Sequence, residues 1–76
     1  MNEENAIKWM QSGDHIYSTI KKPKVGYLGT PAFGTKLDPG VFDKLQKNRI
    51  IRLGMVIDGV AEFDLVSHTA NKKLHP

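Results

Sequence analysis

The sequence predicts a small α+β domain in which a helix, a β-hairpin, a second helix and a second β-hairpin follow one another. Its 76 residues leave room for one domain, and 39% of them are hydrophobic, which is too many for a wholly disordered chain. Two short segments carry helix-capping residues and hydrophobic positions three or four apart, and two others are rich in β-branched residues around turns. We assign a single domain to residues 1–67 and expect a flexible polar tail over 68–76, which has no periodicity.

The first helix is expected over residues 3–12. Asn2 can cap its start, two glutamates lie in its first turn near the positive end of the helix dipole, and Gly13 can close it in a left-handed conformation. Its hydrophobic positions form one stripe, made of Ala6, Ile7, Trp9 and Met10. Because Trp9 lies within that stripe, we expect its side chain to anchor the core.

The first hairpin is expected to join strands at 15–20 and 25–29 through a basic turn at residues 21–24. In that register Ile20 faces Val25, and two further pairs follow, Ser18 with Tyr27 and Tyr17 with Leu28. Residues 30–37 are rich in threonine, glycine and proline and are expected to form a loop, with Phe33 turned inward as its anchor.

The second helix is expected to begin at Asp38 and to run for about ten residues. Asp38 is a good N-cap, and Pro39 suits the first helical position, where its missing N–H is not needed. Asn48 is expected to end the helix in a left-handed conformation. The buried stripe consists of Val41, Phe42 and Leu45.

The second hairpin can form in two registers, which differ in the side chains that share a face. A two-residue turn at Asp58 and Gly59 would place Leu53 opposite Asp64, mixing apolar and acidic side chains. A three-residue loop over 57–59 instead pairs Leu53 with Phe63, and it also gives the pairs Met55 with Ala61, Ile51 with Leu65, and Arg52 with Asp64. We predict the three-residue loop. It leaves an apolar outer face for a partner, formed by Ile50, Val56, Val60 and Val66.

The residues favour a protein that is not an enzyme and that holds no metal or other cofactor. The chain has no cysteine, and His15, His68 and His75 lack the spacing of metal ligands. Asp14 and His15 are neighbours in an extended segment, so they point to opposite sides and cannot share one substrate. No glycine pattern fits a phosphate-binding loop and no serine has an obvious histidine and acid, so we expect no small-molecule substrate.

The sequence also argues against a membrane location. No run approaches the roughly 18–20 apolar residues that cross a bilayer, and the acidic start at residues 1–4 differs from a basic secretory signal. We therefore expect a cytoplasmic protein with no membrane partner. A domain of this size buries only about 60% of its unfolded surface, so a protein partner or a second copy of the chain would add stability.

Positive charge is the main functional signal in the sequence. The net charge is +3, and lysines gather at the tip of the first hairpin and along the second helix. Such clusters can neutralise phosphates, although solvated turns and helix ends carry lysines in any case. The candidate nucleic-acid-binding residues are Lys21, Lys22, Lys24, Lys44, Lys47 and Arg49.

The pattern Val41-Phe42-x-x-Leu45, followed by residues 49–52 and by a hairpin ending at 60–65, resembles the end of small prokaryotic and phage winged-helix domains. The order of elements is also similar to that of the YjhX family of small candidate toxins. The winged-helix resemblance implies DNA binding through the exposed side of the second helix, which would offer Lys44, Gln46 and Lys47. One departure is that strands and loop, not a helix, are expected just before it.

Two functions therefore follow from the sequence. The first is a nucleic-acid-binding accessory or regulatory protein, acting as a homodimer, that uses the basic hairpin tip and the second helix. The second is a phage- or plasmid-encoded protein-binding inhibitor of a host nucleic-acid-handling machine, of the anti-CRISPR or anti-restriction type. The charge clusters and the winged-helix resemblance support the first function, and the inhibitor is the alternative, which the apolar outer face of the second hairpin and the absence of a catalytic set also fit.

Overall fold

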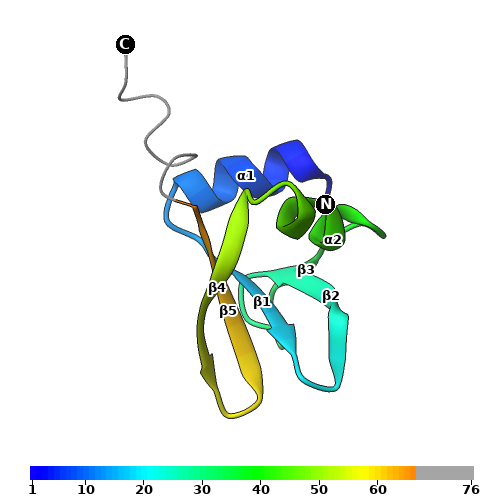
Figure 1. Ribbon diagram of the computed structural model, residues 1–76, viewed down its shortest axis with the longest axis vertical. Helices are drawn as coiled ribbons and strands as arrows, with labels where there is room; N and C mark the ends of the chain where they lie inside the picture. Colours follow the sequence, from blue (N-terminus) through cyan, green and yellow to red (C-terminus); the bar gives the residue numbers. More distant parts are fainter. Residues whose placement is uncertain (67–76) are drawn as a thin grey trace.

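The computed structural model describes residues 1–66, which form one five-stranded antiparallel sheet with two helices packed on one face (Figure 1). The predicted α+β class is confirmed, whereas the predicted tail over 68–76 lies outside the described residues. The strand order in the sheet is β3-β2-β1-β5-β4. The elements, in chain order, are α1 (Glu3–Gln11), β1 (Ile16–Thr19), β2 (Lys22–Leu28), β3 (Thr35–Lys36), α2 (Val41–Lys47), β4 (Ile51–Ile57) and β5 (Val60–Leu65).

One core lies between the helices and the sheet. The rings of Phe42 on α2 and Phe63 on β5 meet edge to face, with their centroids 5.0 Å apart. The second helix and the second hairpin therefore share one interior. The buried hydrophobic residues around it are Ala6, Met10, Ile16, Leu28, Leu37, Leu45 and Ile51.

Helix α1 forms where its capping residues predict it. The side chain of Asn2 accepts a hydrogen bond from the backbone N–H of Asn5 at 2.9 Å, which satisfies one unpaired donor of the first turn. The prediction for Trp9 was wrong, because its side chain is 53% exposed. At 3.6 residues per turn, Trp9 lies about 80° from the line midway between Ala6 and Met10, beyond the stripe that the sheet covers.

The predicted register of the first hairpin was wrong. Tyr17 pairs with Tyr27, and the chain turns at residues 20–21, so that most of the predicted basic turn belongs to β2. Side-chain hydroxyls of β1 explain the earlier turn. The Thr19 hydroxyl accepts a hydrogen bond from the Lys22 N–H at 3.2 Å, and the Ser18 hydroxyl donates one to the Lys22 carbonyl at 3.3 Å.

The loop after β2 does not turn its phenylalanine inward, so the prediction for Phe33 was also wrong. Phe33 is 94% exposed, in a turn closed by a hydrogen bond from its N–H to the Thr30 carbonyl at 3.1 Å. The core position that we assigned to Phe33 is filled by Leu37, which follows β3 and is 4% exposed. Strand β3, which the sequence did not predict, pairs with the end of β2.

Helix α2 begins later than predicted and ends differently. Gly40 adopts a left-handed conformation with φ of 85°, so the helix starts at Val41 and not at Asp38. The Asp38 carboxylate contacts the amino group of Met1 at 2.8 Å and caps nothing. At the other end, the left-handed residue is Arg49, with φ of 55°, and not Asn48.

The second hairpin combines the two registers that the sequence allowed. Asp58 and Gly59 both have positive φ and form a two-residue turn, so Met55 pairs with Glu62 and the three-residue loop was a wrong prediction. Nearer the helices the predicted pairs are present, among them Leu53 with Phe63. The register changes between Leu53 and Met55, because the extra residue of a β-bulge is Gly54 and does not lie in the turn.

The bulge changes which face some residues occupy. Val56, predicted on the outer face, pairs with Ala61 on the face that carries the helices, whereas Met55 lies on the opposite face beside Glu62. Ile50, also predicted on the outer face, packs against the core. Val60 of β5 keeps its predicted position on the outer face, where it pairs with Thr19 of β1.

Candidate functional site

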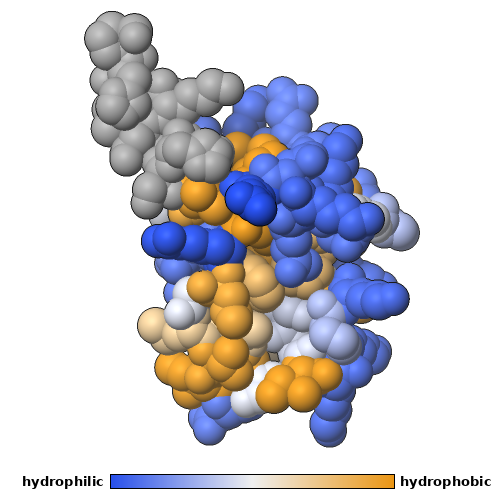
Figure 2. Space-filling model, in the orientation of Figure 1, coloured by the Kyte–Doolittle hydropathy of each residue, from blue (hydrophilic) through white to orange (hydrophobic). Residues whose placement is uncertain are grey.

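The helices cover only part of the sheet, and exposed apolar side chains lie at the far ends of both hairpins. Figure 2 shows hydrophobic surface gathered there, away from the helices. The exposed fractions run from 50% for Met55 to 67% for Ile20. A shallow cavity of about 330 Å³ lies between the two hairpins, lined in part by Ile20, Leu53 and Val56. The full set of exposed large hydrophobic residues in this apolar end is Ile20, Leu53, Met55, Val56 and Ile57.

Strand β4 is at an edge of the sheet. Its inner side pairs with β5, and among residues 1–66 no strand pairs with its outer side. Only Ile51, its first residue, is buried, and the other six residues are exposed. A long exposed edge with apolar side chains is a template for pairing with another strand.

The predicted partner residues divide between these surfaces and the core. Val56 belongs to the apolar end, and Val60 lies half-buried on the outer face of β5. Ile50 and Val66 lie near the helices, where the Val66 N–H donates to the Ile50 carbonyl at 2.9 Å. Val56 and Val60 thus lie toward the hairpin ends, whereas Ile50 and Val66 lie beside the helices.

The predicted nucleic-acid-binding lysines come together only in part. Lys24 on β2 and Lys47 on α2 line one groove, of about 460 Å³, whose wall also includes Pro23 and Gln46. Lys47 contacts Asp43 at 3.2 Å, so part of its charge in the groove is neutralised.

The remaining predicted cations lie around this groove or away from it. Lys44 contacts Glu3 on α1 at 3.4 Å, which ties the two helices together. Lys21 and Lys22 are exposed at the end of the first hairpin, and Arg49 is exposed in the turn after α2. Exposed ion pairs of this kind contribute little to stability, so a partner can displace them at a small cost in free energy.

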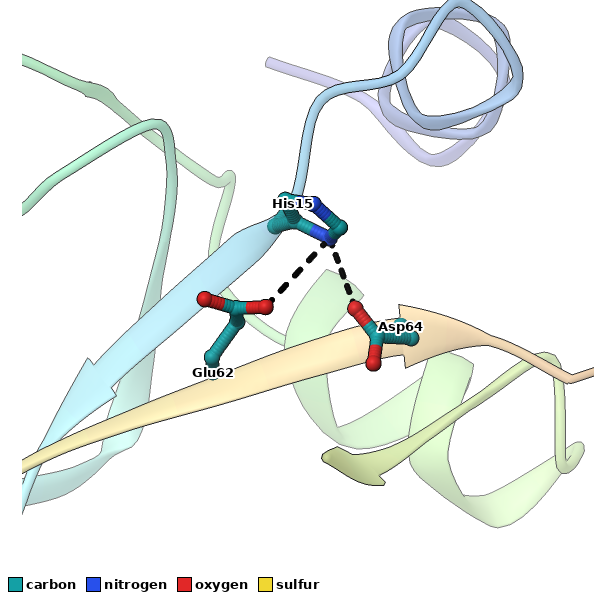
Figure 3. Close-up of side chains that lie close together, drawn as sticks. All are labelled: His15, Glu62 and Asp64. Atoms are coloured by element: carbon teal, nitrogen blue, oxygen red, sulfur yellow. Dashed lines mark ion pairs between the residues drawn. The ribbon is translucent and has the colours of Figure 1, made fainter. Parts of the chain in front are cut away.

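A third feature is a cluster of His15, Glu62 and Asp64 on the outer face of the sheet (Figure 3). The Nδ1 atom of His15 lies 2.6 Å from Oδ1 of Asp64 and 3.7 Å from Oε1 of Glu62. Burial, together with the negative charge and the hydrogen bond of Glu62, raises the pKa of the neighbouring Tyr17 hydroxyl. These three side chains are the ones within residues 1–66 that are placed to hold a metal ion.

No local sequence pattern marks this cluster, because its members are far apart in the chain. Strands β1 and β5 pair in the middle of the sheet, with Ile16 opposite Phe63 and Tyr17 opposite Glu62. That pairing places His15 beside Asp64. The alternation of Glu62 and Asp64 was a visible signal for two carboxylates on one face of a strand, but only the pairing with β1 adds the histidine.

A comparison of this chain with protein-family models, with curated proteins and with solved structures finds no match. Neither helix of residues 1–66 has the length and the hydrophobicity that a membrane crossing requires.

Proposed function

We propose that the chain is a small non-catalytic protein-binding module that pairs its edge strand β4 with a strand of a partner protein. The observation that carries the proposal is an edge strand with six of its seven residues exposed. In such strand addition the backbone hydrogen bonds supply affinity, and alternate side chains supply specificity. A host nucleic-acid-handling protein blocked by a phage- or plasmid-encoded inhibitor is one such partner, and a second copy of the chain is another.

The side chains of β4 support this mode because they are apolar on both faces. Leu53 and Val56 lie on the helix side of the sheet, and Met55 and Ile57 lie on the other side. A strand added at this edge would cover part of each of the four side chains. Exposed apolar patches of this kind mark protein interaction sites on soluble domains.

The charge beside the apolar end favours a partner with acidic residues. Lys21, Lys22 and Lys24 are exposed next to Ile20, at the end of the neighbouring hairpin. Complementary charge around an apolar contact raises the association rate and excludes partners of like charge. The expected partner therefore offers an apolar strand or ridge with carboxylates at its rim.

A double substitution on β4 tests the proposal. Met55→Lys with Ile57→Lys places two charges on one face of the edge and is expected to abolish capture of the partner from a lysate of the host cell. The matched control is Phe33→Lys, because Phe33 is 94% exposed on a different part of the molecule. Capture is measured by mass spectrometry of proteins retained on the immobilised chain.

Light scattering at two protein concentrations separates a second copy from a different partner. If self-association is the function, the parent chain and Phe33→Lys form a dimer and the β4 variant stays monomeric. The proposal fails if the β4 variant is folded by circular dichroism and yet retains the same partners as the parent.

A second candidate function, nucleic-acid binding, is favoured by the groove between β2 and α2. Lys24 and Lys47 flank this groove, and Lys21 and Lys22 extend the positive charge along the hairpin. This candidate includes the winged-helix-like role that the resemblance implies for α2 and the hairpin after it. The contacts would be to phosphates, which give affinity without sequence preference.

Salt dependence tests the second candidate. Binding to duplex DNA, followed by fluorescence anisotropy, is expected to weaken as salt rises, and Lys24→Gln is expected to reduce the slope of log K against log salt by about 0.9. Lys8→Gln is the control, since Lys8 is exposed on α1. An affinity for DNA that is undetectable at low salt, or that is unchanged by salt, would exclude this function.

A further inference from the structure

We propose that His15, Glu62 and Asp64 form a binding site for a divalent transition metal ion, best suited to Zn²⁺. The donor atoms are one imidazole nitrogen and two carboxylate oxygens, all within 4.8 Å of one another. This inference is independent of the proposed function, because none of the three residues belongs to the edge strand β4.

The donor set favours zinc over the common hard cations. Imidazole suits zinc and its neighbours in the first transition series, whereas magnesium and calcium prefer oxygen ligands alone. Three protein ligands with an open fourth position are usual where zinc retains a water molecule. Here the open side faces solvent, since the side chains of His15 and Asp64 are 42% and 40% exposed.

The distances between the donor atoms require only a small adjustment to fit a tetrahedral zinc ion. Tetrahedral zinc ligands at 2.0–2.1 Å from the metal stand about 3.3 Å apart. The distances from His15 Nδ1 to the two oxygens are 2.6 Å and 3.7 Å, one shorter and one longer than that separation. Rotation of the Glu62 and Asp64 side chains can equalise these distances without movement of the sheet, because both residues lie in the paired strand β5 and His15 directly precedes β1.

Asp64 gives a second reason for the assignment. Its Oδ1 atom is shielded from solvent and accepts no hydrogen bond within residues 1–66, although His15 Nδ1 is 2.6 Å away. Buried carboxylate oxygens are normally paired. A cation bound between the imidazole and Asp64 would supply the partner that this oxygen lacks.

The surroundings hold two of the ligands in place. Tyr17 pairs with Glu62 across β1 and β5, which places its side chain beside that ligand, as outer-shell partners of metal ligands are placed. The bulge residue Gly54 lies against the Asp64 carboxylate, and a side chain at that position would collide with it. The bulge in β4 thus leaves the space that Asp64 occupies.

The experiment uses the full chain carrying His68→Gln and His75→Gln, so that these other two histidines cannot bind the metal. Titration with ZnCl₂ by calorimetry is expected to give one equivalent of binding. Glu62→Gln or Asp64→Asn is expected to weaken it by about 100-fold or more, and Tyr17→Phe by about 10-fold. Glu4→Gln, on the exposed side of α1, is the matched control and should leave the affinity unchanged.

Spectroscopy on the same parent chain keeps the test valid if a variant fails to fold. Zn²⁺ should shift the ¹⁵N resonance of His15 Nδ1, and Co²⁺ should give the visible absorption of a tetrahedral site, whereas MgCl₂ should do neither. The proposal is overturned if no binding is detected at millimolar ZnCl₂, or if one equivalent binds with equal affinity to folded Glu62→Gln and Asp64→Asn. In either case the cluster is a contact between an imidazole and two carboxylates that binds no metal ion.

Discussion

Replacement of Phe42 by alanine is expected to lower the free energy of unfolding by about 3–5 kcal/mol. Phe42 is 2% exposed and packs edge to face on Phe63, so the substitution removes a large buried side chain and leaves a cavity between α2 and the sheet. A domain of this size is stable by roughly 4–11 kcal/mol in total. The substitution should therefore remove a large part of the total stability, which urea denaturation followed by circular dichroism can measure.

The control for this experiment is Phe33→Ala, which removes the same side chain from a position that is 94% exposed. It is expected to change the free energy of unfolding by no more than about 0.5 kcal/mol. If Phe42→Ala costs as little as Phe33→Ala, the core described between α2 and β5 is wrong.

Replacement of Gly26 by alanine is also expected to lower the free energy of unfolding substantially. A Cβ atom at Gly26 would lie 2.7 Å from Cδ1 of Phe42 and 3.0 Å from a methyl carbon of Leu37. Both neighbours are buried, so neither can move aside without disturbing the core. Overpacking of this kind costs about 1–3 kcal/mol, which urea denaturation can measure.

A double-mutant cycle distinguishes this collision from a general effect of alanine in a strand. The smaller side chain in Phe42→Leu leaves room for the new methyl group, so Gly26→Ala should cost about 1 kcal/mol less in that background than in the parent. Simple additivity of the two substitutions would show that the ring of Phe42 is not what excludes a side chain at Gly26.

The elements that the sequence predicted well are those with local signals. Asn2 marked the start of α1, and the spacing of Phe42 and Leu45 placed the buried side of α2. Trp9 and Phe33 were misplaced because hydrophobicity alone does not tell which side of a short helix, or which side chain of a loop, the sheet will cover. That depends on contacts between segments distant in the chain.

The strand registers also depend on more than one local signal. Asp58 and Gly59 favour a two-residue turn, and hydrophobic pairing favours a different alignment farther along the hairpin. Gly54 satisfies both by forming a bulge, an outcome that neither signal predicts by itself. The cluster around His15 depends on the pairing of β1 with β5, which joins residues almost fifty positions apart and has no local signature.

The two edges of the sheet differ in a way that limits the growth of any assembly. At one edge β3 is only two residues long, too short to accept the seven-residue β4 of another molecule. Head-to-tail pairing of β4 with β3 is therefore disfavoured, whereas two copies that pair β4 with β4 would form a symmetric contact that closes after a single pair. Self-association through the exposed edge strand β4 would therefore stop at a dimer and would not continue into a polymer.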